Sequence, residues 1–138
     1  MEAVLDSSTV LAWVLREETR ALDYADAVLR AADEGAVFHA PFIFEAEIAA
    51  VLLRAVRRRA LTIEIMNEAL ARLEDVDVRI HHNPYTARSI IAIAGRHHLQ
   101  AYDALYFHLA QVLGLPIATL DGGLRTAAKA HGVKLFAA

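Results

Sequence analysis

Short apolar runs alternating with longer helix-forming stretches constrain this chain more than any other feature. Five segments have the length and pattern of strands: residues 3–5, 37–40, 76–80, 116–120 and 133–136. Strands separated by helices need crossover connections, which favour a parallel sheet covered on both faces. The pattern predicts a three-layer α/β/α fold with a mainly parallel central sheet of about five strands.

Helix start and stop signals divide the intervening sequence. Ser7 and Ser8 are natural N-caps for a first helix, and Thr62 is one for a later helix. Gly95 and Gly114 are expected to end two others. The predicted helices cover about residues 9–15, 19–33, 42–59, 63–73, 87–94, 102–113 and 124–131.

The composition bounds the class of protein. A chain of 138 residues with 57% hydrophobic residues predicts one compact domain over 1–138. The absence of cysteine excludes disulfides, thiolate catalysis and cysteine zinc sites. No apolar run approaches the roughly 20 residues of a membrane span, and no signal peptide is recognisable. We therefore expect a cytoplasmic protein with no membrane partner.

The net charge excludes little. A value of −3, with a sequence pI of about 6.1, is not the basic balance of a protein that holds nucleic acid through phosphate contacts alone. A hydrolase that gathers carboxylates around metal would also be acidic, because the metal supplies the local positive charge.

Two predicted strands are followed by aspartate, Asp6 and Asp121. In open α/β sheets, ligands bind beyond the carboxyl ends of the strands, so these carboxylates are expected to converge there. The alternative is that each side chain simply caps the following helix, a role that aspartate fills well.

Two further acids lie within apolar helical sequence. Glu47 has Ala46 and Ile48 as neighbours, whereas Glu45 lies about 200° away around the helix. Glu47 is therefore the better candidate for an inward side chain. Asp103 opens an otherwise apolar helix, where its alternative role is a first-turn acid favoured by the helix dipole.

Four gathered carboxylates would repel one another and raise each other's pKa values, and a divalent cation would remove that penalty. Carboxylate oxygens and water favour Mg²⁺ or Mn²⁺ over Zn²⁺. Such a site can hydrolyse phosphodiesters. The acids therefore favour a metal-dependent nuclease, although acid-containing α/β proteins often offer similar sets.

Four sequence blocks, in order, resemble the PIN-domain family and its VapC toxins. They are VLDSS at 4–8, PFIFEAEIAAVL at 41–52, AYDALYFHLA at 101–110 and IATLDGGL at 117–124. Many relatives have asparagine three residues after the glutamate, where this chain has Ala50. If that asparagine orients the glutamate, its absence weakens the support for Glu47 but removes no proposed ligand.

The resemblance implies a metal-dependent endoribonuclease that acts as the toxin of a toxin–antitoxin pair. Asp6, Glu47 and Asp103 would hold Mg²⁺ or Mn²⁺, and Asp121 would complete the site directly or through water. Ser8 and Thr119 would hydrogen-bond the carboxylates or a metal-bound water, unless they serve only capping and strand packing. The implied partners are an RNA substrate, a cognate antitoxin protein, and a second copy in a homodimer or toxin–antitoxin hetero-oligomer.

Several other features are open to two interpretations. Arg125 and Lys129 are four residues apart on one helix face, so they are candidates for RNA contact. The arginines at 54 and 57–59 are more typical of a solvated helix end, with RNA or an acidic antitoxin segment as the alternative. Adjacent histidine pairs are poorly spaced for a metal site. The aromatic residues Trp13, Tyr102, Tyr106 and Phe107 are expected to serve core or interface packing rather than base stacking.

The sequence leaves two alternative functions open. One is a PIN fold that binds RNA or protein without cutting, for which the loss of an acid would be the sign. The other is a small-molecule binding protein in which the acids are only caps. No glycine-rich phosphate loop supports the second rival, since Gly122 and Gly123 form too short a motif.

Overall fold

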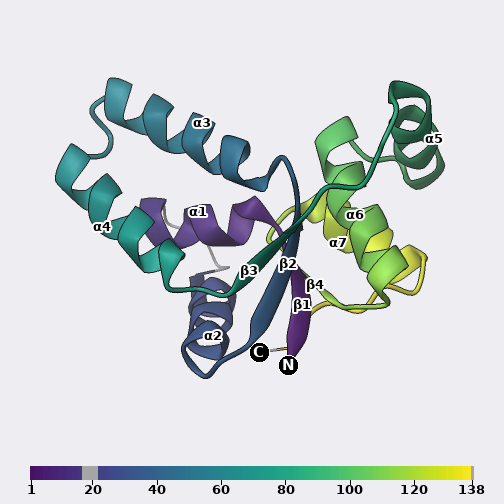
Figure 1. Cartoon of the computed structure of the whole chain (residues 1–138), viewed down its shortest axis with the longest axis horizontal. Helices are drawn as coiled ribbons and strands as arrows, with labels where there is room; N and C mark the ends of the chain where they lie inside the picture. Colours follow the sequence, from purple (N-terminus) through teal and green to yellow (C-terminus); the bar gives the residue numbers. More distant parts are fainter. Residues whose placement is uncertain (17–21, 138) are drawn as a thin grey trace.

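The computed structural model describes residues 1–16 and 22–137 of the chain (Figure 1). The elements are β1 (Glu2–Leu5), α1 (Ser7–Leu15), α2 (Leu22–Asp33), β2 (Val37–Pro41), α3 (Phe44–Arg57), α4 (Ile63–Glu74), β3 (Val78–His81), α5 (Ala87–His97), α6 (Ala101–Leu113), β4 (Ile117–Ala118) and α7 (Gly122–Ala130).

The described strands form one parallel sheet in the order β3-β2-β1-β4. The sheet has four strands, not the five or so that the sequence predicts. Residues 133–136 lie beside β4 but form only an isolated bridge, between Leu135 and Ile117. β4 itself has only two residues, so it offers little ladder for a fifth strand to extend.

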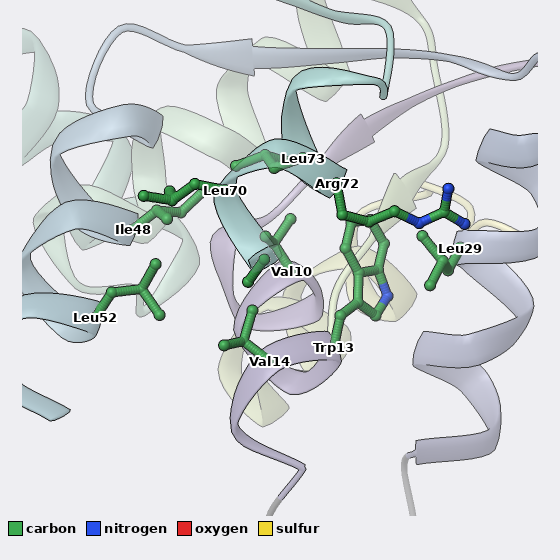
Figure 2. A pocket seen from close by; sticks show the side chains of 10 residues that line it. Val10, Trp13, Val14, Leu29, Ile48, Leu52, Leu70, Arg72 and Leu73 are labelled. Atoms are coloured by element: carbon green, nitrogen blue, oxygen red, sulfur yellow. The ribbon is translucent and has the colours of Figure 1, made fainter. Parts of the chain in front are cut away.

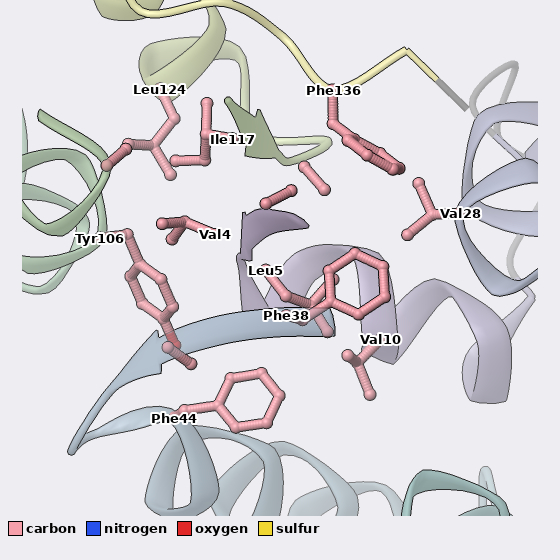
Figure 3. Close-up of a cluster of buried hydrophobic side chains, with 14 of the residues drawn as sticks. Val4, Leu5, Val10, Val28, Phe38, Phe44, Tyr106, Ile117, Leu124 and Phe136 are labelled. Carbon is pink, nitrogen blue, oxygen red and sulfur yellow. The ribbon is translucent and has the colours of Figure 1, made fainter. Parts of the chain in front are cut away.

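Helices cover both faces of the sheet, which confirms the three-layer architecture. Figure 1 shows α1 to α4 on one side of the strands and α5 to α7 on the other. Successive residues of a strand point to opposite faces. Accordingly, Val4 faces Tyr106 of α6, whereas Leu5 lies near Phe38 and Val10 (Figure 3). Both faces of β1 are therefore buried, and this explains its uninterrupted apolar sequence.

The observed helix ends show which local signals decided them. Thr62 caps α4 by accepting a hydrogen bond from the Ile65 amide at 3.2 Å, and Gly114 ends α6 with a φ of 66°. The sequence predicted that Gly95 ends α5, and this prediction is wrong. The helix continues to His97, and His98 takes up the left-handed conformation that ends it.

The remaining boundaries differ from the predictions by a few residues. The predicted start of the second helix at Thr19 lies outside the described residues, which resume with α2 at Leu22. Among the described residues, no helix is long and apolar enough to span a membrane.

A small apolar hollow of about 90 Å³ separates α1 and α2 from the hairpin of α3 and α4 (Figure 2). The indole ring of Trp13 forms one wall, and Val14, Leu70 and Leu73 are among its neighbours. The indole Nε1 donates a hydrogen bond to the Ala25 carbonyl oxygen at 2.7 Å, which joins α1 to α2.

Candidate active site

Asp6 follows β1 directly, and its side chain is only 3% exposed. Its Oδ2 accepts hydrogen bonds from Ser8 Oγ at 2.5 Å and from Thr119 Oγ1 at 2.7 Å. Asp6 is also the N-cap residue of α1, yet its side chain makes no capping hydrogen bond. Helix capping therefore does not account for this buried acid.

Ser8 and Thr119 join the ends of β1 and β4. Besides its bond to Asp6, Thr119 Oγ1 accepts from the Asp121 amide at 3.0 Å, and Ser8 Oγ accepts from the Leu120 amide at 3.1 Å. Of the roles left open by the sequence, carboxylate hydrogen bonding is the one found for both residues. They fix the Asp6 carboxylate and the turn that carries Asp121.

Glu47 is half-buried on α3, whereas Glu45 is exposed, so the expected inward glutamate is confirmed. Glu47 Oε1 accepts hydrogen bonds from Tyr106 Oη at 2.5 Å and from Ser7 Oγ at 3.5 Å. Burial raises the pKa of Glu47, the Tyr106 bond opposes that rise, and the nearby Asp6 charge adds to it.

Asp103 lies in the first turn of α6 and is half-buried. Burial, and after it the charges of Asp121, Asp6 and Glu47 in that order, together raise the pKa of Asp103 to about 6. Burial also raises the pKa of Asp6, which the Asp121 charge reinforces. These mutual effects mean that all four predicted acids lie close enough to act on one another.

Asp121 has two roles. Its Oδ2 accepts a hydrogen bond from the Leu124 amide at 2.9 Å, so it caps α7 as the alternative interpretation proposed. It also lines a surface hollow together with Glu47 and Asp103. A Cβ at Gly123 would lie 3.1 Å from Asp121 Oδ2, so the glycine leaves the Asp121 side chain room for its capping position.

The hollow that contains the acids has a volume of about 510 Å³. Its other walls come from the α5–α6 connection and the start of α6, which sequence reasoning did not include in the site. These residues are His98, Leu99, Gln100 and Tyr102. Tyr106 and Phe107 are fully buried as expected, but Tyr102 is 62% exposed and is not a core residue. Its position next to Asp103 at a helix start was the signal that could have placed it in the site.

In the described part of the chain, the negative charge of these acids is not balanced by any ion pair. None of the ion pairs found among residues 1–16 and 22–137 includes any of the four acids. Of the residues that the structure describes, neither a lysine nor an arginine lines the hollow. Carboxylates that lie close together without a basic partner are the donor set that suits a hard divalent cation, so the residues fit Mg²⁺ or Mn²⁺.

The acids form an open cluster rather than a closed coordination shell. Within the described part of the chain, no group of three or more histidine, aspartate or glutamate side chains is already arranged to enclose a metal ion.

Arg125 and Lys129 line a different hollow, together with Thr126, Val133 and Leu135. The Arg125 Nε donates to the Thr119 carbonyl oxygen at 2.8 Å, and its guanidinium lies 4.6 Å from the Tyr24 ring centre. Arg125 therefore holds the end of β4 in place. Contact of either residue with RNA stays a prediction.

Comparison with known proteins places the chain in a sequence family. The family model described as "PIN domain" matches residues 3–130. Ribonuclease VapC3 of Mycobacterium tuberculosis is 33% identical over 135 residues, which are 96% of this chain and 92% of that protein. Ribonuclease VapC1 of the same organism is 31% identical over 127 residues, covering 91% and 90% of the two chains.

Two solved structures share the fold at low sequence identity. The crystal structure of PAE2754 from Pyrobaculum aerophilum has a TM-score of 0.66 and 19% identity, covering 92% of this chain and 79% of that one. A PilT N-terminus domain protein, SSO1118 from Sulfolobus solfataricus, has a TM-score of 0.51 and 15% identity, covering 99% and 86%. The α/β fold of this chain is thus also found in these two solved structures.

Proposed function

Because this chain belongs to the PIN-domain family, as a relative of the VapC ribonucleases, we propose that it is a metal-dependent endoribonuclease. It hydrolyses RNA phosphodiester bonds and acts as the toxin of a toxin–antitoxin pair. The observation that supports this most strongly is the set of four mutually repelling carboxylates at the carboxyl end of the sheet, for which the described residues provide no ion-pair partner.

Each acid has a defined role in the proposal. Asp6, Glu47 and Asp103 hold the cation, and Asp121 completes the set directly or through water. A bound Mg²⁺ or Mn²⁺ would activate water for attack and neutralise charge on the scissile phosphate.

The surrounding residues keep the carboxylates in position. Ser8 and Thr119 hold one oxygen of Asp6, and Tyr106 and Ser7 hold one oxygen of Glu47. Within the described residues, Asp6 Oδ1 and Glu47 Oε2 have no hydrogen bond, so each acid keeps one oxygen for a ligand. Fixed donors of this kind reduce the reorganisation needed when the cation binds.

The proposal also includes protein partners and a cellular location. A cognate antitoxin protein would neutralise the ribonuclease, and the chain would form a homodimer and a toxin–antitoxin hetero-oligomer in the cytoplasm.

The function is tested by incubating purified, antitoxin-free protein with cellular RNA in Mg²⁺, Mn²⁺ or EDTA. Wild type is expected to cut only with metal, and Asp6→Asn, Asp103→Asn and Glu47→Gln are expected to lose cleavage. Glu45→Gln is the matched control for Glu47→Gln, because it removes a charge from the exposed face of the same helix.

Circular dichroism of every variant separates lost chemistry from lost folding. Folded wild type that cuts no RNA, or folded Asp103→Asn that cuts as well as wild type, would show that the four-acid mechanism is wrong. A binding module without nuclease activity would then become the better explanation.

A further inference from the structure

The hollow that contains the acids has two chemically different halves. One half carries the carboxylates of Glu47, Asp103 and Asp121. The other half carries no carboxylate. It is lined by residues from the α5–α6 connection and the start of α6: His98, Leu99, Gln100 and Tyr102. A carboxylate cluster for metal needs only the first half, so the second half has no role in the mechanism above.

Tyr102 is the most unusual member of the second half. It is 62% exposed, which is more than any other phenylalanine, tyrosine or tryptophan among the described residues. The other three tyrosines use their hydroxyl groups within the fold: Tyr24 on the Phe136 carbonyl, Tyr85 on His108 and Tyr106 on Glu47. No hydrogen bond in the described part of the chain involves the Tyr102 hydroxyl, so packing of the fold does not explain this side chain.

Its neighbours supply polar groups that the fold does not use. Gln100 is the N-cap residue of α6, but its side chain makes no capping hydrogen bond. His98 is exposed and has a φ of 54°, a backbone conformation uncommon for a residue other than glycine. The Gln100 amide, the His98 imidazole and the exposed Tyr102 ring thus line the same hollow as the carboxylates.

The charges in the hollow indicate which half can attract an RNA substrate. An RNA strand is a polyanion, the hollow carries three carboxylates, and no lysine or arginine among residues 1–16 and 22–137 lines it. Arg125, the nearest candidate considered from sequence, is committed to the Thr119 carbonyl and the Tyr24 ring. Within this hollow, the exposed Tyr102 ring is therefore a group on which an unpaired base of single-stranded RNA can stack.

We propose that Tyr102, with His98 and Gln100, forms a subsite for an unpaired nucleobase of the RNA strand. The base stacks on the Tyr102 ring, and the Gln100 amide faces its hydrogen-bonding edge. Because Asp103 is the next residue in the helix, this base belongs to a nucleotide beside the scissile phosphate. The subsite selects single-stranded over duplex RNA, since a paired base cannot be inserted. This inference rests on the proposed ribonuclease function.

The test compares binding of a short fluorescein-labelled oligoadenylate with an abasic ribose-phosphate strand of the same length. Fluorescence anisotropy is measured in Ca²⁺, with a gel to show that the strands stay intact. Wild type and Tyr102→Phe are expected to prefer the strand that has bases. Tyr102→Ala is expected to bind oligoadenylate at least about fivefold more weakly, the lower range for stacking of one base, and to bind the abasic strand unchanged.

Val112→Ala is the matched control, because Val112 is 59% exposed on the same helix and does not line the hollow. It is expected to bind both strands like wild type. The proposal is overturned if folded Tyr102→Ala binds oligoadenylate like wild type. It is also overturned if that variant loses affinity equally for both strands, because the residue would then act without contacting a base.

Failure of the subsite and failure of the proposed function give different results. Metal-dependent cleavage by wild type, with no effect of Tyr102→Ala on base preference, would overturn the subsite alone. Absence of cleavage by folded, antitoxin-free wild type would overturn the ribonuclease function, and with it the inference that depends on it.

Discussion

Ala50 stands where many relatives have an asparagine, and the structure shows what supports Glu47 instead. The fully buried Tyr106 donates its hydroxyl to Glu47 Oε1 at 2.5 Å, from a helix on the other side of the sheet. Burial and the bond to Glu47 hold the pKa of Tyr106 well above its usual value, so the hydroxyl remains a donor. The sequence around Glu47 could not reveal this partner, because it lies 59 residues further along the chain.

Tyr106→Phe is therefore expected to weaken metal binding while keeping the ring in the core. Loss of a hydrogen bond behind a metal ligand typically lowers metal affinity about 10–100-fold. Isothermal titration with Mn²⁺ measures the change. Tyr85→Phe is the matched control, because it removes a hydroxyl that bonds His108 and does not line the acid hollow.

The same titration in a Glu47→Gln background tests the route of the effect. If Tyr106 acts through Glu47, Tyr106→Phe should cause little further loss once the carboxylate is absent. An equal loss in both backgrounds would mean that the phenol supports the core and not the ligand.

Asp103 gives the metal-free protein a defined pH dependence. Its pKa is about 6 when folded, against a reference value of 3.8, so the folded state binds the proton more tightly. Stability contributed by that proton is present below about pH 4 and is lost as pH rises towards about 6. In EDTA, Asp103→Asn is therefore expected to melt at a higher temperature than wild type near neutral pH.

Near pH 4 this advantage should disappear, because wild-type Asp103 is then largely protonated. Thermal unfolding followed by circular dichroism at both pH values makes the comparison. An Asp103→Asn effect that is the same at both pH values would contradict the raised pKa.

At the scale of single elements, the local sequence predicted the presence of each helix better than the residues at which it begins and ends. Gly114 and Gly95 both resemble helix stops, but only Gly114 has a positive φ. Gly95 lies inside α5, and a Cβ built there meets no atom within 4 Å. The stop of α5 depends instead on His98, a residue type that gives little warning of a left-handed conformation.

The two glycines should respond oppositely to alanine. Gly95→Ala is expected to stabilise the protein by about 0.5–1 kcal/mol, because alanine loses less backbone entropy within a helix. Gly114→Ala is expected to destabilise it by about 1 kcal/mol, since alanine is strained at a φ of 66°. Urea unfolding of the pair measures both changes, and a loss of stability in Gly95→Ala would show that α5 needs the glycine.

At the scale of the whole molecule, the sequence predicted the carboxylate half of the site because parallel strands end at one edge. Asp6 and Asp121 follow neighbouring strands, and two helices bring in Glu47 and Asp103. The half with Tyr102 was missed, because it depends on how the end of α5 packs beside α7, where a Cβ on Gly123 would lie 4.0 Å from Leu99. The strand count was overestimated for a similar reason, since apolar sequence at 133–136 does not specify its pairing.

Metal should stabilise the whole fold through the four acids. A ligand at about 100 times its dissociation constant adds about 2.7 kcal/mol to the free energy of unfolding. Mn²⁺ is therefore expected to raise the melting temperature of wild type and to have much less effect on Asp103→Asn. Equal shifts for both proteins would place the bound ion elsewhere.

Trp13 is the only tryptophan in the chain, and it lies in the wall of the apolar hollow between α1, α2 and α4. Its indole is hydrogen-bonded to the Ala25 carbonyl, so its emission spectrum depends on the contact between α1 and α2. The protein thus carries a natural optical probe of that hollow. Selective excitation of the indole would therefore report a loss of packing between α1 and α2 without any label.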